Sequence, residues 1–228
     1  MPYDSGNMAS TFSPRLDILP SAQRRLWPDL SQTPQQFILY GGTAIALQLG
    51  HRVSVDFDFF AFADVDTTHL HLSVPYLRDA KVIQHEANTL TCLIGTDHPV
   101  KVSFFGLPKQ HPVDPALFAT GNNLPVASLL DLAATKMLTV QSRAQAKDYL
   151  DVDALISHGI TLNKALAAAK KVYGAAFEPT PTLKALTYFD DGDLPSVPQD
   201  VRKRLVKASA AVDPTRLIDK STDREPGA

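Results

Sequence analysis

The chain has 228 residues, of which 44% are hydrophobic and 20% are charged. These proportions exclude a wholly disordered protein and indicate a globular one with a core of its own. Its 22 Lys and Arg residues nearly balance 24 Asp and Glu residues, so no overall positive field draws it to nucleic acid or anionic lipid, and any RNA contact needs a local basic patch. The single cysteine, Cys92, excludes an internal disulfide and a multi-cysteine zinc site, and we interpret it as a structural thiol in a strand.

The first part of the chain predicts strands and helices in alternation. Residues 1–15 are rich in small and turn-forming residues and predict a flexible tail without the apolar run of a secretion signal. Residues 36–42 form an apolar run that ends in two glycines, the pattern of a strand entering a tight turn. Residues 43–50 then predict a short helix closed by Gly50. No apolar run is long enough to cross a bilayer, so we expect a cytoplasmic protein without membrane contact.

The rest of the chain changes from strands to helices. Residues 54–62 predict a strand, residues 68–80 a helix interrupted near Pro75, and residues 81–105 three further strands. From residue 126 on, apolar residues recur at helical spacing. This order predicts an α+β fold with a mixed β-sheet and a helical C-terminal part. We place a first domain at 16–122, a helical domain at 123–218 and a second flexible tail at 219–228.

Two carboxylates and a glycine turn carry the strongest chemical signal. In a strand, Asp56 and Asp58 lie about 6.6 Å apart along the chain and leave on the same face. Two such carboxylates suit Mg²⁺, which prefers a few carboxylates together with water and substrate phosphates. Gly41 and Gly42 stand where a strand gives way to a helix, so backbone N–H groups there can receive a polyphosphate, and Thr43 adds a hydroxyl.

Each of these features is common when it stands alone. Paired glycines occur in many turns, and two aspartates at this spacing also occur as solvated charges on strand edges. Here Asp56 follows Gly42 by fourteen residues, and Val55, Phe57 and Phe59 bracket the aspartates with apolar side chains. The combination therefore favours a nucleotide-transfer site over a solvated edge.

The segment YGGTAIALQLGHRVSVDFDFF, residues 40–60, resembles the first motif of the nucleotidyltransferase fold as it occurs in AbiEii/AbiGii-type toxins of type IV toxin–antitoxin and abortive-infection systems. The resemblance extends from about residue 19 to residue 210. It implies a minimal nucleotidyltransferase domain followed by a helical domain, with the active site in the cleft between them. It also implies transfer of a nucleoside monophosphate from an NTP to an RNA acceptor such as the 3′ end of a tRNA, release of pyrophosphate, and an antitoxin partner.

The segment TKMLTVQSRAQAKDYLDVDAL, residues 135–155, resembles the later motifs of the same family. The resemblance implies that Lys136 contacts the triphosphate and that Asp148 begins the following helix. The apolar neighbours of Lys136 favour an inward position over a solvated helix surface. For Asp148 three roles stay open: general base for the acceptor hydroxyl, anchor for Lys136 and Arg143, or a helix-starting acid. Asp151 is the second candidate.

One position departs from the pattern of polymerase-like nucleotidyltransferases. The strand VKVSFF presents Ser103 where the resemblance leads us to expect a third carboxylate. Two further hypotheses therefore stay open beside a transferase acting on RNA: a catalytically impaired protein that binds a nucleotide or a partner, and transfer to a protein or a small molecule. We assign no metal to the histidines, because no carboxylate completes a zinc-ligand spacing.

A basic run near the C-terminus is the best candidate for an RNA-facing patch. A solvated helix face is the more frequent outcome for such a run. Its members are Arg202, Lys203, Arg204 and Lys207.

Overall fold

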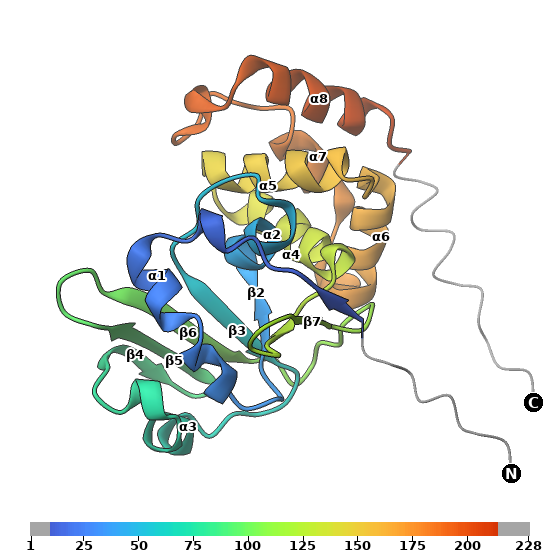
Figure 1. Ribbon diagram of the computed structural model, residues 1–228. Helices are drawn as coiled ribbons and strands as arrows, with labels where there is room; N and C mark the ends of the chain where they lie inside the picture. Colours follow the sequence, from blue (N-terminus) through green and yellow to red (C-terminus); the bar gives the residue numbers. More distant parts are fainter. Residues whose placement is uncertain (1–9, 214–228) are drawn as a thin grey trace, which may run out of the picture. The chain divides into compact units, whose positions relative to one another are not determined.

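The structure of the protein is a computed structural model that describes residues 10–213 (Figure 1). The chain divides into two compact units, which we call the sheet unit and the helical unit. The sheet unit comprises Met1–Lys109 and Pro115–Ser128, and the helical unit comprises Gln110–Asp114 and Leu129–Ala228. The sheet unit is thus interrupted once by a short segment that belongs with the helices.

The sheet unit contains a mixed sheet whose strand order, within the described residues, is β1-β7-β8-β2-β3-β6-β5-β4. The strands are β1 (Thr11–Phe12), β2 (Ile38–Tyr40), β3 (Phe57–Ala61), β4 (Lys81–Glu86), β5 (Thr89–Ile94), β6 (Val100–Gly106), β7 (Leu117–Ala119) and β8 (Pro125–Val126). β3 runs parallel to β6 and antiparallel to β2. β3 therefore has a partner strand on each side, and this pairing fixes the face of the sheet on which each of its side chains lies.

The two faces of the sheet differ in polarity because side chains alternate along each strand. On β3 the side chains of Phe57 and Phe59 are fully buried, while Asp58 between them is only partly buried. Trp27 follows α1 (Ser21–Leu26), and its ring centroid lies 6.4 Å from that of Phe57. The hydrophobic core thus lies against one face of β3, and Asp58 shares the opposite, partly buried face with Phe60.

Two helices of the sheet unit follow the sequence signals closely. α2 (Gly41–Leu49) joins β2 to β3, contacts both strands and buries most of its side chains. It ends at Gly50, whose φ of +67° lies in the left-handed region that favours glycine. α3 (Thr67–Ser73) begins at Asp66, whose side chain caps it, and ends two residues before Pro75. The predicted helix and its interruption are confirmed.

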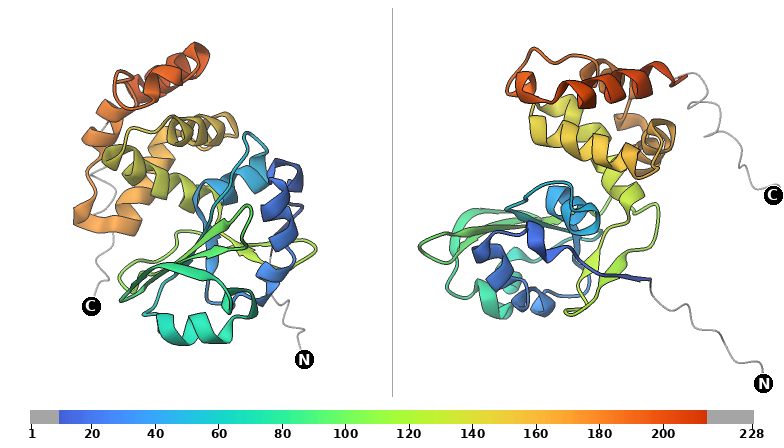
Figure 2. Two further views of the ribbon diagram at one scale, coloured as in Figure 1. Left: turned by 90° about the vertical axis from the view of Figure 1, so that its left-hand side faces the viewer. Right: turned by 45° about the horizontal axis from the view of Figure 1, so that its top comes forward.

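The helical unit is built around its first long helix (Figure 2). Its helices within the described residues are α4 (Leu129–Ser142), α5 (Ala146–Ser157), α6 (Leu162–Tyr173), α7 (Pro179–Ala185) and α8 (Gln199–Ala210). α4 contacts α5, α6 and α7, and α8 packs on α5. Leu132 and Met137 of α4 and Leu166 of α6 are buried between them. α4 also contains the predicted site residue Lys136, whose side chain is buried.

The predicted α+β fold, with a mixed sheet followed by helices, is confirmed. The strand predicted over 54–62 is shorter, because β3 covers only Phe57–Ala61. The residues before it bond to a helix instead of a strand: the backbone carbonyl of Asp56 accepts from the hydroxyl of Thr43 in α2, and Ser54 lies 2.7 Å from the same hydroxyl. Asp56 is therefore held at the start of the strand and not within it.

Two of the domain limits expected from the sequence involve strand pairings that the sequence did not indicate. The expected boundary between residues 122 and 123 lies in the turn of a hairpin, because Leu117 of β7 pairs with Val126 of β8. The expected tail over 1–15 is described from residue 10, where β1 pairs with β7; the tail over 219–228 lies outside the described residues. None of the described helices is both long and apolar enough to cross a membrane.

Candidate active site

Two aspartates at the start of β3 define the candidate site. Asp58 pairs in register with Tyr40 of β2 on one side and with Ser103 of β6 on the other. Asp56 lies two residues earlier, and its carboxylate is 3.1 Å from the ammonium group of Lys101, which lies two residues before Ser103. Since alternate residues of a strand share a face, this contact places both carboxylates on the same face of the sheet.

The third carboxylate of the general pattern has no counterpart here. Ser103, which stands opposite Asp58, is buried and uncharged. Across residues 10–213, no group of three or more His, Cys, Asp or Glu side chains is arranged to hold a metal ion. The protein therefore contributes two carboxylates to this face, and any further ligands of a metal would come from substrate and water.

Gly41 brings the backbone of α2 against one of these carboxylates. Its φ is +74°, a conformation that other residues adopt only with strain. A Cβ atom added there would lie 2.8 Å from Oδ2 of Asp58. The side chain of Tyr40, the residue before α2, makes no capping hydrogen bond, and the N–H groups of the first turn, Gly42 included, form a positive end beside the aspartate.

Thr43 positions the site from inside the protein. It is buried, and its hydroxyl donates to the backbone carbonyl of Asp56 and contacts Ser54. The sequence suggested this hydroxyl as a donor to nucleotide, but the structure directs it to the chain segment that carries Asp56. The predicted residues Gly41, Gly42, Thr43, Asp56 and Asp58 are thus brought together in the sheet unit.

The other two predicted residues form a separate ionic cluster in the helical unit. Lys136 of α4 is buried, and its Nζ lies 2.6 Å from Oδ1 of Asp148 and 2.7 Å from Oδ2 of Asp151, both on α5. Arg143, between the two helices, donates to both oxygens of Asp148 at 2.8 and 3.1 Å. Two cations and two carboxylates therefore balance, and we call these four residues the buried ion cluster.

Asp148 is held in its ionised form by this cluster. Burial by itself raises the pKa of Asp148, but the hydrogen bonds from Arg143 and the charge of Lys136 outweigh it and leave the pKa below its ordinary value. A general base works best when its pKa lies near the working pH. A carboxylate with a lowered pKa suits the anchoring role better than the role of a base.

A comparison with protein families shows to which family the chain belongs. The model of the family described as "Nucleotidyl transferase AbiEii toxin, Type IV TA system" matches residues 25–222. The chain belongs to the AbiEii nucleotidyltransferase toxin family. The proteins of this family are nucleotidyltransferase toxins, so membership implies a nucleotide substrate and an antitoxin. The resemblance found in the sequence is thereby confirmed.

The chain is also similar to individual proteins. The uncharacterized protein aq_aa25 of Aquifex aeolicus (strain VF5) is 29% identical over 166 residues, which cover 68% of this chain and 74% of the relative. Among solved structures, the toxin MenT4 of Mycobacterium tuberculosis H37Rv matches with a TM-score of 0.60 and 19% identity over 89% of this chain and 86% of MenT4. A putative nucleotidyltransferase of H. pylori matches with a TM-score of 0.55 and 15% identity over 89% and 97%. At these identities the two structures show the shared fold.

Lys101 is the residue of this candidate site that the sequence analysis missed. The signal was present: Lys101 precedes Ser103 by two residues, so any strand that places Ser103 beside Asp58 places Lys101 on the same face. The side chains of Lys101 and Asp56 remain 40% and 30% exposed. A ligand can therefore reach this ion pair.

The basic run on α8 is partly occupied by contacts within the chain. Arg204 donates to both oxygens of Asp153 at 2.7 Å and to Asp200 at 2.9 Å. Arg202 bonds backbone carbonyls and lies over the ring of Phe189. The two arginines of the run therefore stabilise the helical unit, and its two lysines remain exposed.

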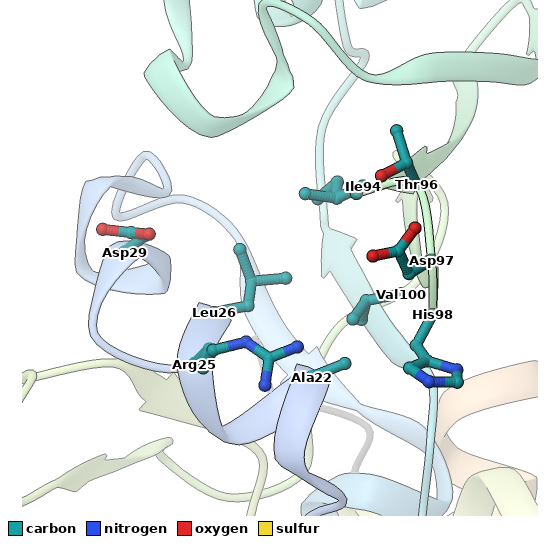
Figure 3. A pocket seen from close by; sticks show the side chains of 10 residues that line it. Ala22, Arg25, Leu26, Asp29, Ile94, Thr96, Asp97, His98 and Val100 are labelled. Carbon is teal, nitrogen blue, oxygen red and sulfur yellow. The ribbon is translucent and has the colours of Figure 1, made fainter.

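A pocket of about 320 Å³ opens elsewhere in the sheet unit, between α1 and the turn that joins β5 to β6 (Figure 3). Arg25, Asp97 and His98 are among the side chains that line it. Its lining contains neither aspartate of the candidate site nor Lys101. The carboxylate site is thus a feature of the sheet face and not of this pocket.

Proposed function

We propose that this AbiEii-family protein is a magnesium-dependent enzyme that transfers a nucleoside monophosphate from an NTP to an RNA acceptor, the 3′ end of a tRNA, and releases pyrophosphate. The observation that carries the proposal is the placement of Asp58 against the backbone of Gly41, with Asp56 on the same face. The choice of RNA as acceptor rests on the family resemblance of residues 40–60 and 135–155.

The residues present fit a divalent cation. Two carboxylates share one face of the sheet, and the missing side chain of Gly41 leaves a space that Oδ2 of Asp58 borders. Carboxylate oxygens are the ligands that Mg²⁺ prefers, and this ion commonly completes its shell with water and substrate phosphates. Asp56 and Asp58 would hold Mg²⁺, which supplies positive charge for the phosphate oxygens of the NTP.

The reaction needs one bond formed and one broken at the α-phosphorus. The acceptor hydroxyl oxygen forms a bond to that phosphorus, the bond to the bridging oxygen of the β-phosphate breaks, and pyrophosphate leaves with the electron pair. The hydroxyl proton goes to solvent. In this scheme the N–H groups at the start of α2, at Gly41 and Gly42, donate to phosphate oxygens, and Thr43 keeps Asp56 in place.

The buried ion cluster supports a positioning role for Asp148 within the helical unit. Its carboxylate joins α5 to Lys136 of α4 and to Arg143, and its pKa is lowered. This geometry agrees with the anchoring role among those left open by the sequence. The contact of Lys136 with the triphosphate stays a prediction, and such a contact would have to compete with Asp148 and Asp151.

A second candidate function rests on a specific observation. Because Ser103 replaces a carboxylate beside Asp58 and no third acid joins the site within residues 10–213, the same fold could bind a nucleotide or a partner protein without transfer. This candidate differs from the first in one measurable respect, the release of pyrophosphate.

Labelled NTPs separate these functions. The full chain is incubated with each α-³²P-labelled NTP, Mg²⁺ and either bulk tRNA or RNA-depleted cell extract, and the products are treated with ribonuclease or protease. Label that joins tRNA and is removed by ribonuclease supports the proposal. Label on protein instead supports transfer to a protein, and NTP binding without any transfer supports the impaired reading. Asp58→Asn serves as the control, since it removes one proposed metal ligand.

A further inference from the structure

The ion pair between Lys101 and Asp56 lies where the polymerase-like pattern would place more negative charge. β3 and β6 run parallel, with Asp58 opposite Ser103. Two residues earlier in each segment, the ammonium group of Lys101 lies 3.1 Å from the carboxylate of Asp56. The protein therefore presents a lysine and a serine on β6 beside its two aspartates. Lys101 therefore places a positive charge on the face of β6 from which a third carboxylate would act.

The charge of this face limits how many cations it holds. Two metal ions about 4 Å apart are normally held by carboxylates that they share. Here Asp56 and Asp58 contribute two negative charges and Lys101 cancels one of them. One divalent ion is enough to make this face positive toward a triphosphate, whereas a second would face the lysine ammonium without a carboxylate of its own.

We propose that Lys101 takes the place of a second metal ion: the site binds one divalent cation at Asp56 and Asp58, and the Lys101 ammonium contacts a phosphate group of the NTP. The inference rests on the proposed function, because it concerns the same nucleotide. Without nucleotide, Lys101 pairs with Asp56. With nucleotide bound, its three N–H donors are shared between Asp56 and phosphate oxygens.

The exposure of the pair allows this exchange. The Lys101 side chain is 40% exposed, so its ammonium keeps contact with water and can be reached by a ligand. An exposed ion pair of this kind contributes little to stability, so the pair is readily redirected. Lys136 differs, because its ammonium is buried between two carboxylates of α5.

The first test counts bound metal. Mn²⁺ replaces Mg²⁺, an α,β-methylene NTP analogue replaces the substrate, and electron paramagnetic resonance with equilibrium dialysis gives the ratio of Mn²⁺ to analogue to full-length protein. The inference predicts a ratio of one to one to one. Two Mn²⁺ ions per bound analogue would overturn it.

The second test removes the lysine and measures two affinities that should move in opposite directions. In Lys101→Ala, Mn²⁺ binding without nucleotide tightens by at least about 5-fold because a neighbouring positive charge is gone. Binding of the analogue weakens by about 10-fold or more because a charge-assisted hydrogen bond to phosphate is lost. Lys101→Arg restores part of the analogue affinity, since it keeps the charge with a different shape.

Lys81→Ala is the matched control, because Lys81 is an exposed lysine on β4 at the edge of the same sheet. It should change neither affinity. If Lys101 served only to hold Asp56 in place, Lys101→Ala would weaken Mn²⁺ binding instead of strengthening it, and the inference would be wrong. Thermal unfolding of each variant shows whether the fold is kept.

The outcomes separate this inference from the proposed function. Nucleotide transfer by a protein that binds two Mn²⁺ ions would leave the function standing and overturn the role of Lys101. A one-to-one-to-one complex in a protein that transfers no nucleotide would do the reverse. A protein that does not bind the analogue at all would contradict both.

Discussion

Aspartates lie beside a lysine in both units, but the two units surround these ions differently. In the sheet unit, Asp56 and Lys101 keep 30% and 40% of their side chains exposed. In the helical unit, Asp148 and Asp151 keep none and Lys136 keeps 6%. The same residue types are thus open to solvent in one place and enclosed in the other.

Burial, more than residue type, decides what an ion pair does. An exposed pair exchanges its partners with water at little cost, so it can turn to a phosphate or a metal. A buried pair has lost its hydration, and each ion depends on its partners, so removal of one strands the others. We therefore propose that the carboxylates of the sheet unit carry the chemistry and that the buried ion cluster has a positioning role.

The largest effect on stability is expected from the buried ion cluster. Lys136→Met removes the cation that Asp148 and Asp151 share, although Arg143 still pairs with Asp148. Breaking a buried pair in this way costs about 3–5 kcal/mol. The measurement is the free energy of unfolding in urea. Lys171→Met, at an exposed position of α6, should stay within about 0.5 kcal/mol of the parent. Equal stability of the two variants would show that the cluster does not hold the helical unit.

A second prediction tests the close approach at the start of α2. In Gly41→Ala the new Cβ meets Oδ2 of Asp58, as the distance of 2.8 Å shows, so the carboxylate must move. A displacement of about 1 Å at a reacting centre can cost about 100-fold in rate, and we expect transfer to fall by that order. The readout is labelled product per folded protein.

Gly121→Ala is the control for this prediction, because Gly121 also has a positive φ, +96°, but nothing lies within 4 Å of its added Cβ. Both variants should lose about 1–2 kcal/mol of stability from backbone strain. Only Gly41→Ala should lose transfer. A similar loss of transfer in both would assign the effect to strain and not to Asp58.

The ionisation of Asp148 makes the stability of the helical unit depend on pH. The pKa of Asp148 is lowered in the folded protein, so the unfolded chain binds its proton first as the pH falls. The stabilisation by Asp148 is therefore complete above the ordinary aspartate pKa of 3.8 and is lost as the pH falls through the lower folded value. Unfolding in urea between about pH 5 and pH 3 should show a decline in the parent that is shallower in Asp148→Asn. Parallel curves would contradict the ion pairing.

The smallest effect is expected on α8. Arg204 is half exposed, although it pairs with Asp153 and Asp200, and such pairs contribute about 0.2–1 kcal/mol. Arg204→Ala should lower the free energy of unfolding by that amount, and Lys203→Ala should leave it unchanged. If the basic run contacts RNA through its exposed lysines, Lys203→Ala should weaken RNA binding more than Arg204→Ala does, as a filter-binding assay would show.

Local sequence patterns predicted the parts of the site that depend on neighbours along the chain. A glycine at the junction of a strand and a helix and two aspartates at alternate positions are short-range signals, and Gly41 lies against Asp58 as that pattern suggests. The apolar neighbours of Lys136 correctly indicated that it points inward. The α+β fold followed from the order of the elements.

Contacts between distant segments could not be read in this way. The pairing of β3 with β6 brings Lys101 to Asp56 across 45 residues of chain, and strand register is set by packing of the whole sheet. The same holds for Thr43, whose hydroxyl was expected at a ligand and bonds the carbonyl of Asp56 instead. Asp151 was ranked second although it shares Lys136 equally with Asp148.

The most direct experiment compares pyrophosphate release by the full chain and by Asp58→Asn with the same NTP, Mg²⁺ and RNA acceptor. It tests the proposal that nucleotide transfer depends on the carboxylates of the sheet unit. We expect the parent to release pyrophosphate in step with labelled RNA, and we expect release by Asp58→Asn to fall by more than about 100-fold, beyond the loss typical for residues that only support a metal ligand. Urea unfolding of the two proteins should coincide. Undiminished release by a folded Asp58→Asn protein would show that Asp58 is not needed for transfer.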